Sequence, residues 1–312
     1  MKDVAASFQY DLSGLAPEDW TETLETVSED HGYFEPVGPH HSAAFIDAGR
    51  TLLVTFEAAA TIRGTNVGAA PLGWSFVTDN GWSSLTIMSE RAGDWFRHPA
   101  MFGFFDRMID DGFFDDFDQI LFYGAGAGGY AAAAFSVAAP DARVLAIQPQ
   151  ATLDTGLAGW DRRFPKARRL DFSSRYGYAP QMVETASDVW IIHDPLILED
   201  AVHASLFRGD NTRHLLCRNL NKRADRSLMG LGIWTDLIEQ AMAGELTELS
   251  YAHLWRARQD NLKYLRTLFN ELDDAGTHPR LLARLCRAVT DNANRPLFAQ
   301  KLAELEAQGI TP

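Results

Sequence analysis

The segment QILFYGAGAGGYAAAAF, residues 119–135, constrains the fold more than any other part of the chain. A short apolar strand runs into a turn of glycines and alanines and then into a helix of small residues. Gly124, Gly126 and Gly129 fit the pattern G-x-G-x-x-G, which cradles the phosphates of a dinucleotide. The same letters fit the strand-turn-helix elbow G-x-S-x-G, in which Gly126 takes the place of the nucleophilic serine. The two interpretations predict different chemistry.

Strands and helices alternate around this turn over about 200 residues. Segments Ser42–Ile46 and Thr51–Phe56 are expected to form a β-hairpin across a turn at 47–50. A strand at 119–123, a helix at 129–138 and a strand at 143–147 form a βαβ unit, which requires parallel pairing. Further strands are expected at 83–89, 188–195 and 212–220, and further helices at 99–112, 197–207 and 225–242.

This alternation predicts an α/β fold with helices on both faces of a mostly parallel sheet that an antiparallel hairpin opens. We expect residues 1–240 to form this domain, with an insert or cap at about 151–187. Residues 241–312 read as helices only, because apolar side chains recur there at helical spacing. These C-terminal helices are expected to pack onto the main domain, and contact with a protein partner is the alternative.

Composition excludes several classes of function. The chain has 42 acidic against 28 basic residues, a formal net charge of −14, which argues against non-specific binding of nucleic acid. It has no apolar run of signal-peptide or membrane-spanning length, so no membrane association and a cytoplasmic location are expected. Cys217 and Cys286 have no partners at metal spacing and read as buried thiols. We therefore expect no metal and no cofactor.

The dinucleotide interpretation makes two further demands. The glycine turn should open the first βαβ unit, and an acid should end the following strand to bind the ribose. Three expected strands precede the turn, and Gln148 and Gln150 stand where the acid should be. A glutamine can still bond a ribose, so a nucleotide-dependent oxidoreductase using Gly124, Gly126 and Gly129 remains the alternative function.

The segment FYGAGAGGYAAAAFSVAAPDARVLAIQPQATLD resembles the elbow region of α/β-hydrolase-fold proteins. It also resembles a bacterial group of uncharacterised, hydrolase-like proteins that share a serine-less turn. This resemblance covers about residues 40–240 and puts the nucleophile at Gly126 and the acid at Asp194, although an Asp before proline is more often a helix cap. The histidine position falls in NLNKRADRS, residues 219–227, which contains none. The resemblance thus implies an inherited fold without an intact triad.

Some members of that group are labelled phosphoadenosine-phosphosulfate reductases. That activity implies a redox-active cysteine in an E-C-G type motif. Cys217 in LLCRNL and Cys286 in ARLCRAV do not match this motif, so the label is not supported by the residues.

A turn of small residues at a helix N-terminus still presents backbone N–H groups to an anion. We therefore expect a ligand site at Gly124, Gly126, Ala127 and Gly128. Arginines that follow the carboxyl ends of strands would complete an anion-binding cleft, and the alternative is that they are solvated and paired with acids. The candidates are Arg63, Arg162, Arg163 and Arg175, with a second cluster at Arg218, Lys222, Arg223 and Arg226. The predicted function is binding of a small anionic ligand or a protein partner by a catalytically degenerate hydrolase-like protein.

Overall fold

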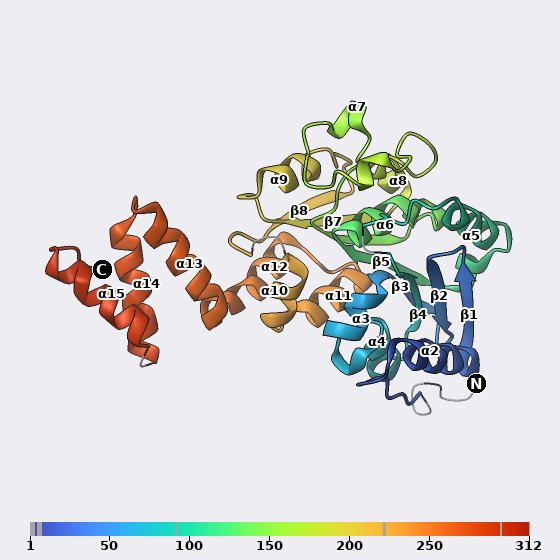
Figure 1. The fold of residues 1–312 in the computed structure, drawn as a ribbon, viewed down its shortest axis with the longest axis horizontal. Coiled ribbons are helices and arrows are strands. Elements are labelled where there is room, and N and C mark those ends of the chain that lie inside the picture. The colour runs from blue at the N-terminus through green and yellow to red at the C-terminus, as the bar shows by residue number, and fades with distance from the viewer. Residues whose placement is uncertain (1–3, 5–7, 92, 221–222, 294, 312) are drawn as a thin grey trace.

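The computed structural model describes residues 4, 8–91, 93–220, 223–293 and 295–311. Within these residues, eight strands form one sheet in the order β1-β2-β4-β3-β5-β6-β7-β8 (Figure 1). Strand β2 runs antiparallel to both of its neighbours, and all other pairs are parallel. The strands are β1 Gly32–Val37, β2 His41–Ile46, β3 Thr51–Ala58, β4 Ser83–Ser89, β5 Gln119–Ala125, β6 Arg143–Ile147, β7 Asp188–His193 and β8 Thr212–Leu216.

Helices cover both faces of the sheet, which confirms the fold class predicted from the sequence. Alternate side chains of each central strand enter different cores: Phe122 of β5 packs with α5 and α6, and Leu121 packs with α10 and α11. This period of two is what a sheet buried on both faces requires. The helices of the main body are α2 Pro17–His31, α3 Ala59–Thr65, α4 Trp74–Asn80, α5 Pro99–Asp110, α6 Ala127–Phe135, α7 Thr155–Ala158, α8 Ala179–Met182, α9 Leu198–Ala204, α10 Ala224–Gly230 and α11 Trp234–Ala243.

The hairpin expected between Ser42–Ile46 and Thr51–Phe56 is wrong in its pairing. Strand β4 lies between these two strands, antiparallel to β2 and parallel to β3. The side chain of Ser83, at the start of β4, accepts hydrogen bonds from the N–H groups of Ala48 and Gly49, both at 3.0 Å, and so ties the connecting turn to β4. The hairpin partner of β2 is instead β1, an edge strand that contains Pro36, a residue that is unfavourable within a strand and that made β1 hard to recognise in the sequence.

The C-terminal helices build a core of their own. Helices α12 Glu248–Leu254 and α13 Leu262–Ala275 begin beside the sheet domain, and α14 Pro279–Asn292 and α15 Pro296–Ala307 follow. Phe269, Cys286 and Phe298 belong to a cluster formed by α13, α14 and α15. Figure 1 shows α14 and α15 standing away from the sheet, so packing onto the main domain is correct only for the first part of this region. A partner for these helices stays a prediction.

Two smaller expectations can be compared with the structure. Both cysteines are buried, and burial raises the pKa of the Cys217 and Cys286 thiols. Of the helices that the structure describes, none combines the length and the apolar character needed to cross a bilayer.

Candidate ligand-binding site at the glycine turn

Gly126 occupies the turn between β5 and α6 with φ 57° and ψ −118°, a conformation that side-chain-bearing residues rarely adopt. The turn is held at both ends. The N–H of Gly126 donates to the Ile147 carbonyl at 2.8 Å, and the carbonyl of Gly126 accepts from the Tyr130 N–H at 2.9 Å. Such a sharp strand-to-helix turn in the middle of a sheet is the geometry of a nucleophile elbow.

The glycines of this turn serve two different purposes. A Cβ atom at Gly124 would lie 2.1 Å from the Gly128 carbonyl oxygen, and one at Gly128 would lie 2.3 Å from the Phe56 carbonyl oxygen. These two glycines let the helix approach the strands closely. A Cβ at Gly126 would meet nothing within 4 Å. Gly126 is therefore the position from which a side chain could project, and it carries none.

The position of the turn decides between the two interpretations of the motif. A dinucleotide fold opens with its glycine turn, whereas an elbow follows an antiparallel pair and lies in mid-sheet. Here the turn follows the fifth strand, after the antiparallel pair β1 and β2, and β5 lies between β3 and β6. The arrangement is that of an α/β-hydrolase-like sheet.

A cavity of about 480 Å³ opens beside the elbow. Gly126, Ala127 and Gly128 form one wall. Aromatic side chains supply much of the rest, and the walls also carry four arginines and four acids. These lining residues are Phe56, Trp95, Phe96 and Phe164, then Arg91, Arg163, Arg223 and Arg226, then Glu57, Asp94, Asp200 and Asp225.

Three of the seven described non-glycine residues with positive φ line the same cavity. Trp95, Phe96 and Gln148 line it with φ values of 51°, 56° and 48°. The Trp95 indole N–H donates to Gln150 Oε1 at 2.9 Å, which fixes this conformation. Bulky residues at positive φ cost on the order of 1 to 3 kcal/mol each and cluster at functional sites. This backbone strain makes the cavity a candidate functional site.

Glu57 is the last residue but one of strand β3 and is buried in the cavity wall. Its carboxylate accepts hydrogen bonds from the Thr55 hydroxyl at 2.9 Å and the Leu72 N–H at 3.0 Å. Asn66 Nδ2 donates to it at 2.9 Å. Burial raises the pKa of Glu57, while these donors act in the opposite direction. The signal for Glu57 in the sequence was a lone acid at the end of an apolar strand.

Asp94 is another carboxylate of the cavity lining that accepts hydrogen bonds from protein groups. His41 Nε2 lies 2.8 Å from Asp94 Oδ2, and the Ser89 hydroxyl donates to the same oxygen at 2.8 Å. The Phe96 N–H donates to Asp94 Oδ1 at 3.0 Å. Burial alone would raise the pKa of Asp94, but these three partners outweigh it and lower the pKa. Asp94 thus fixes the strained Trp95–Phe96 segment.

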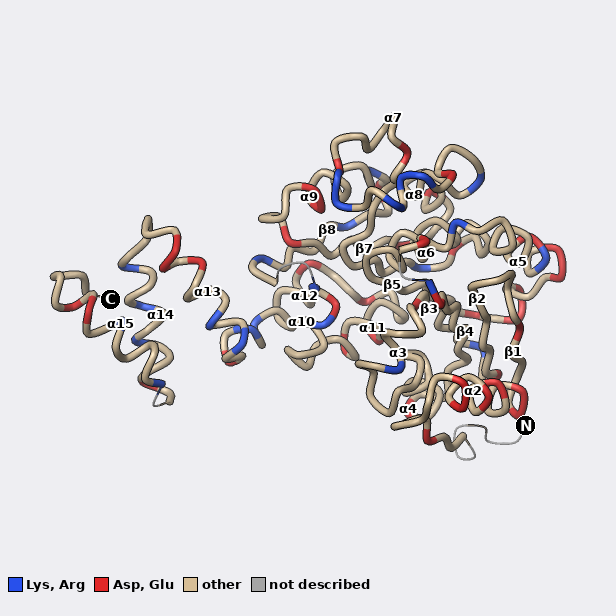
Figure 2. The backbone as a smooth tube through the Cα atoms, viewed as in Figure 1, with Lys and Arg blue, Asp and Glu red and all other residues tan. Residues whose placement is uncertain are grey.

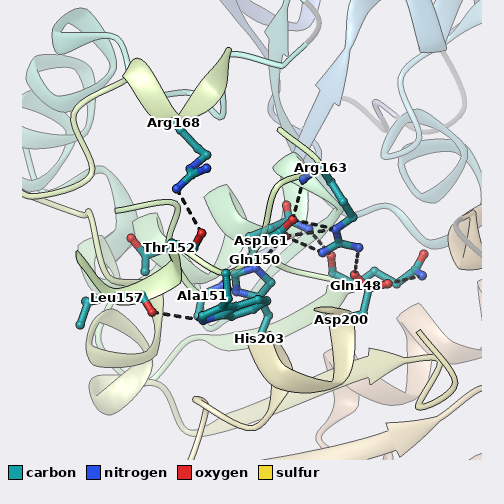
Figure 3. A network of polar contacts seen from close by, with 12 residues as sticks. Gln148, Gln150, Ala151, Thr152, Leu157, Asp161, Arg163, Arg168, Asp200 and His203 are labelled. Carbon is teal, nitrogen blue, oxygen red and sulfur yellow. Dashed lines mark hydrogen bonds and ion pairs between the residues drawn. The ribbon is translucent and has the colours of Figure 1, made fainter. Parts of the chain in front are cut away.

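Asp200 belongs to a buried network around Arg163 (Figure 3). Arg163 Nη1 donates to Asp200 Oδ1 at 2.6 Å, and Gln148 Nε2 donates to Asp200 Oδ2 at 2.9 Å. Arg163 also donates to both oxygens of Asp161, which in turn lies 3.1 Å from His203 Nε2. Burial would raise the pKa of Asp161, but Arg163 outweighs it and lowers the pKa. The network joins the segment between β6 and β7 to helix α9.

The predicted site residues separate into three groups. Gly126, Ala127, Gly128 and Arg163 line the cavity. Gly124 serves the close packing of α6. The remaining candidates lie outside the lining of this cavity: Arg63 faces Glu90 and the Trp20 ring, Arg175 pairs with Asp106, and Arg162 is exposed. Of the second basic cluster, Arg223 and Arg226 line the cavity, and Lys222 lies outside the described residues.

Asp194, the expected acid, is buried and does not line the cavity. Its Oδ1 accepts the Leu196 N–H at 3.0 Å, as a turn-forming aspartate does. His193 and His214 lie edge to face with ring centroids 5.9 Å apart, also outside the lining. Among the described residues, no group of three or more His, Cys, Asp or Glu side chains could hold a metal ion.

Comparison with known proteins gives weak likenesses. No family model matches the chain, and no curated protein matches it. The acylaminoacyl peptidase of Pyrococcus horikoshii aligns over 67% of this chain and 41% of its own, at 10% identity and a TM-score of 0.43. An esterase from Pyrobaculum calidifontis aligns over 69% and 85%, at 15% identity and a TM-score of 0.37. A thermostable carboxylesterase cloned from a metagenomic library aligns over 78% and 98%, at 12% identity and a TM-score of 0.39.

Proposed function

We propose that this chain is a catalytically degenerate α/β-hydrolase-like protein whose elbow cavity binds a small anion with an apolar body and does not hydrolyse it. The observation that carries the proposal is Gly126. It keeps the elbow conformation beside a cavity of about 480 Å³ but has no side chain to act as nucleophile.

The other catalytic groups are missing from the same place. The described residues that line the cavity include no histidine and no cysteine. The Ser89 hydroxyl donates to Asp94, and the Tyr123 hydroxyl accepts from the Trp234 indole at 2.8 Å. The lowered pKa of Asp94 makes it a weak base toward Ser89, and a hydroxyl without a strong neighbouring base stays protonated and is a poor nucleophile. Acyl transfer by an activated side chain is therefore not expected here.

The groups of the cavity that remain available to hydrogen-bond a ligand are mainly donors. Glu57, Asp94 and Asp200 already accept hydrogen bonds from protein groups. The first N–H groups of α6, at Ala127 and Gly128, have no acceptor within the helix and carry its positive dipole end. Arg91 and Arg223, both exposed, add positive charge to the lining, and Arg223 has only a distant partner, Asp225 at 3.8 Å. A carboxylate fits these donors.

The aromatic wall supports an apolar body on the ligand. The Trp95 and Phe164 rings meet edge to face with centroids 4.7 Å apart, and Phe56 and Phe96 lie in the same wall. Cavities of this size suit small organic molecules. A carboxylate held at the elbow would place its hydrocarbon part against these rings.

Calorimetric titration with phenylacetate and its neutral analogue 2-phenylethanol tests the proposal. Phenylacetate should bind and the alcohol should bind about tenfold more weakly, a difference of about 1.4 kcal/mol. Arg91→Gln should weaken phenylacetate binding several-fold, whereas Arg63→Gln, outside the cavity lining, should not. Equal binding of both probes would contradict an anion site. Weakening by Arg63→Gln alone would move the site to the arginine that the sequence suggested.

A further inference from the structure

A second cavity, of about 490 Å³, lies between α10 and the start of α13. Hydrogen bonds connect the residues of its walls. Asn261 Nδ2 donates to the Gly230 carbonyl at 3.0 Å, and Asn261 Oδ1 accepts the Tyr264 N–H at 3.0 Å. We call this cavity the α10–α13 cleft. The cleft shares Arg223 and Arg226 with the elbow cavity, and its other lining residues belong neither to that cavity nor to the core of the C-terminal helices.

The charge in the α10–α13 cleft has one sign. Arg223, Arg226 and Lys263 line it, and none of the described lining residues is acidic. This is unusual in a chain with a net charge of −14. Figure 2 shows basic segments where α13 leaves the body, and both basic and acidic segments at α10. Asn219, Ser227 and Thr267 add polar groups to the same walls.

Protein acids compensate these cations only in part. Arg223 Nε and Arg226 Nε lie 3.8 and 3.6 Å from the same residue, Asp225, which lines the elbow cavity and not the cleft. Arg226 also donates to Asn66 Oδ1 at 3.2 Å, so it is held in place in the wall. Lys263 is exposed and makes no ion pair with any described residue. Two of the three cations thus share one carboxylate, Asp225, and Lys263 has no ion-pair partner among the described residues.

We propose that the α10–α13 cleft binds a small phosphorylated compound. Two arginines and a lysine from two helices can share the charge of a phosphate dianion, which has more acceptor oxygens than a carboxylate. The cleft volume leaves room for the organic part of a phosphomonoester. Arg223 and Arg226 line both cavities, so the two sites are told apart by Lys263, which lines only the cleft, and by Arg91, which lines only the elbow cavity.

Calorimetric titration with phenyl phosphate and inorganic phosphate, at low and high salt, tests the site. Both should bind saturably and more weakly at high salt. Lys263→Gln should weaken both about fivefold to tenfold. Arg266→Gln, an exposed change on the same helix outside the cleft, is the matched control and should have no effect. Glutamine preserves helix propensity in both variants.

Three outcomes would overturn the proposal: no saturable binding, equal weakening by Lys263→Gln and Arg266→Gln, or weakening by Arg91→Gln alone. The last result would place the phosphate in the elbow cavity. Phenylacetate binding should be unchanged in Lys263→Gln. The failure of this site and the failure of the proposed function are therefore distinguishable.

Discussion

Arg163 and Asp200 join two parts of the chain that the sequence separates by a strand: Nη1 of the arginine lies 2.6 Å from Oδ1 of the aspartate. The arginine belongs to the segment between β6 and β7, and the aspartate belongs to α9. The same guanidinium donates to Asp161, which is fully buried. Arg163 therefore neutralises two buried carboxylates and fixes one wall of the elbow cavity.

Replacing Arg163 by glutamine should lower the free energy of unfolding by about 3 kcal/mol, because it leaves buried carboxylates without their cation. Arg175→Gln is the matched control. Arg175 is in the same segment and pairs with Asp106 at the surface, where its side chain is 60% exposed. Such pairs contribute below about 1 kcal/mol. Denaturant unfolding of both variants measures the difference, and equal losses would contradict the role assigned to Arg163.

Stability should fall as the pH falls below about 6.5, in part through His203. The Ala151 N–H can only donate, so Nδ1 of His203 accepts it at 3.2 Å and Nε2 carries the hydrogen that faces Asp161 (Figure 3). Burial lowers the pKa of His203, and Asp161 opposes this only partly. The unfolded chain therefore takes up a proton before the folded one does, and stability is lost by up to about 1.4 kcal/mol per pH unit.

Unfolding at about pH 7.5 and about pH 5.5 tests this linkage. His203→Gln should show a smaller loss of stability between the two pH values than the wild type. His253→Gln, an exposed change on α12, should keep the wild-type loss. His193, whose pKa burial also lowers, contributes in the same direction in all three proteins. An unchanged loss in His203→Gln would refute the assignment.

Gly126→Ser should reduce stability by about 1 to 3 kcal/mol through its positive φ and not through a clash. The variant should hydrolyse 4-nitrophenyl acetate no faster than the background rate, because none of the described residues that line the cavity is a histidine. Gly103→Ser is the control, because a Cβ there also meets nothing within 4 Å and the residue lies in helix α5. A stable or an active Gly126→Ser variant would count against the degenerate elbow.

The C-terminal core should unfold separately from the sheet. Phe298 is 1% exposed and packs against Phe269, so Phe298→Ala should cost about 3 to 5 kcal/mol locally. Hydrogen exchange should accelerate in α13, α14 and α15 while β5 and α6 keep their protection. Leu297→Ala, at a position that is 49% exposed, should change little. Faster exchange in β5 would mean that the two cores unfold as one unit.

Much of the fold could be predicted because period-two and helical patterns are local. The strand Arg143–Ile147 has the expected bounds, and α5 begins at Pro99 as the sequence indicates. The hairpin error arose because pairing is not local. A short turn at 47–50 favours a hairpin. Strand β3, however, is buried on both faces and lies in mid-sheet, where it pairs with β4 instead of β2.

The site was predictable only where the backbone defines it. The glycine turn gave Gly126, Ala127 and Gly128, which do line the cavity. The pairing of arginines with acids depends on tertiary contacts, so Arg63 and Arg175 could not be separated from Arg163 by sequence spacing. Glu57 was missed because its donors come from Asn66 and Leu72, on the connection after its own strand.

A titration of ¹⁵N-labelled wild-type protein with phenylacetate, followed by amide chemical shifts, tests whether the elbow cavity binds a carboxylate at Gly126. The Ala127 and Gly128 amides should shift progressively and saturate at the concentration that calorimetry gives, because their N–H groups face the carboxylate. The backbone amide of Lys263, in the α10–α13 cleft, should not move. Saturable shifts confined to residues outside the elbow cavity, or none at all, would contradict a ligand site at Gly126.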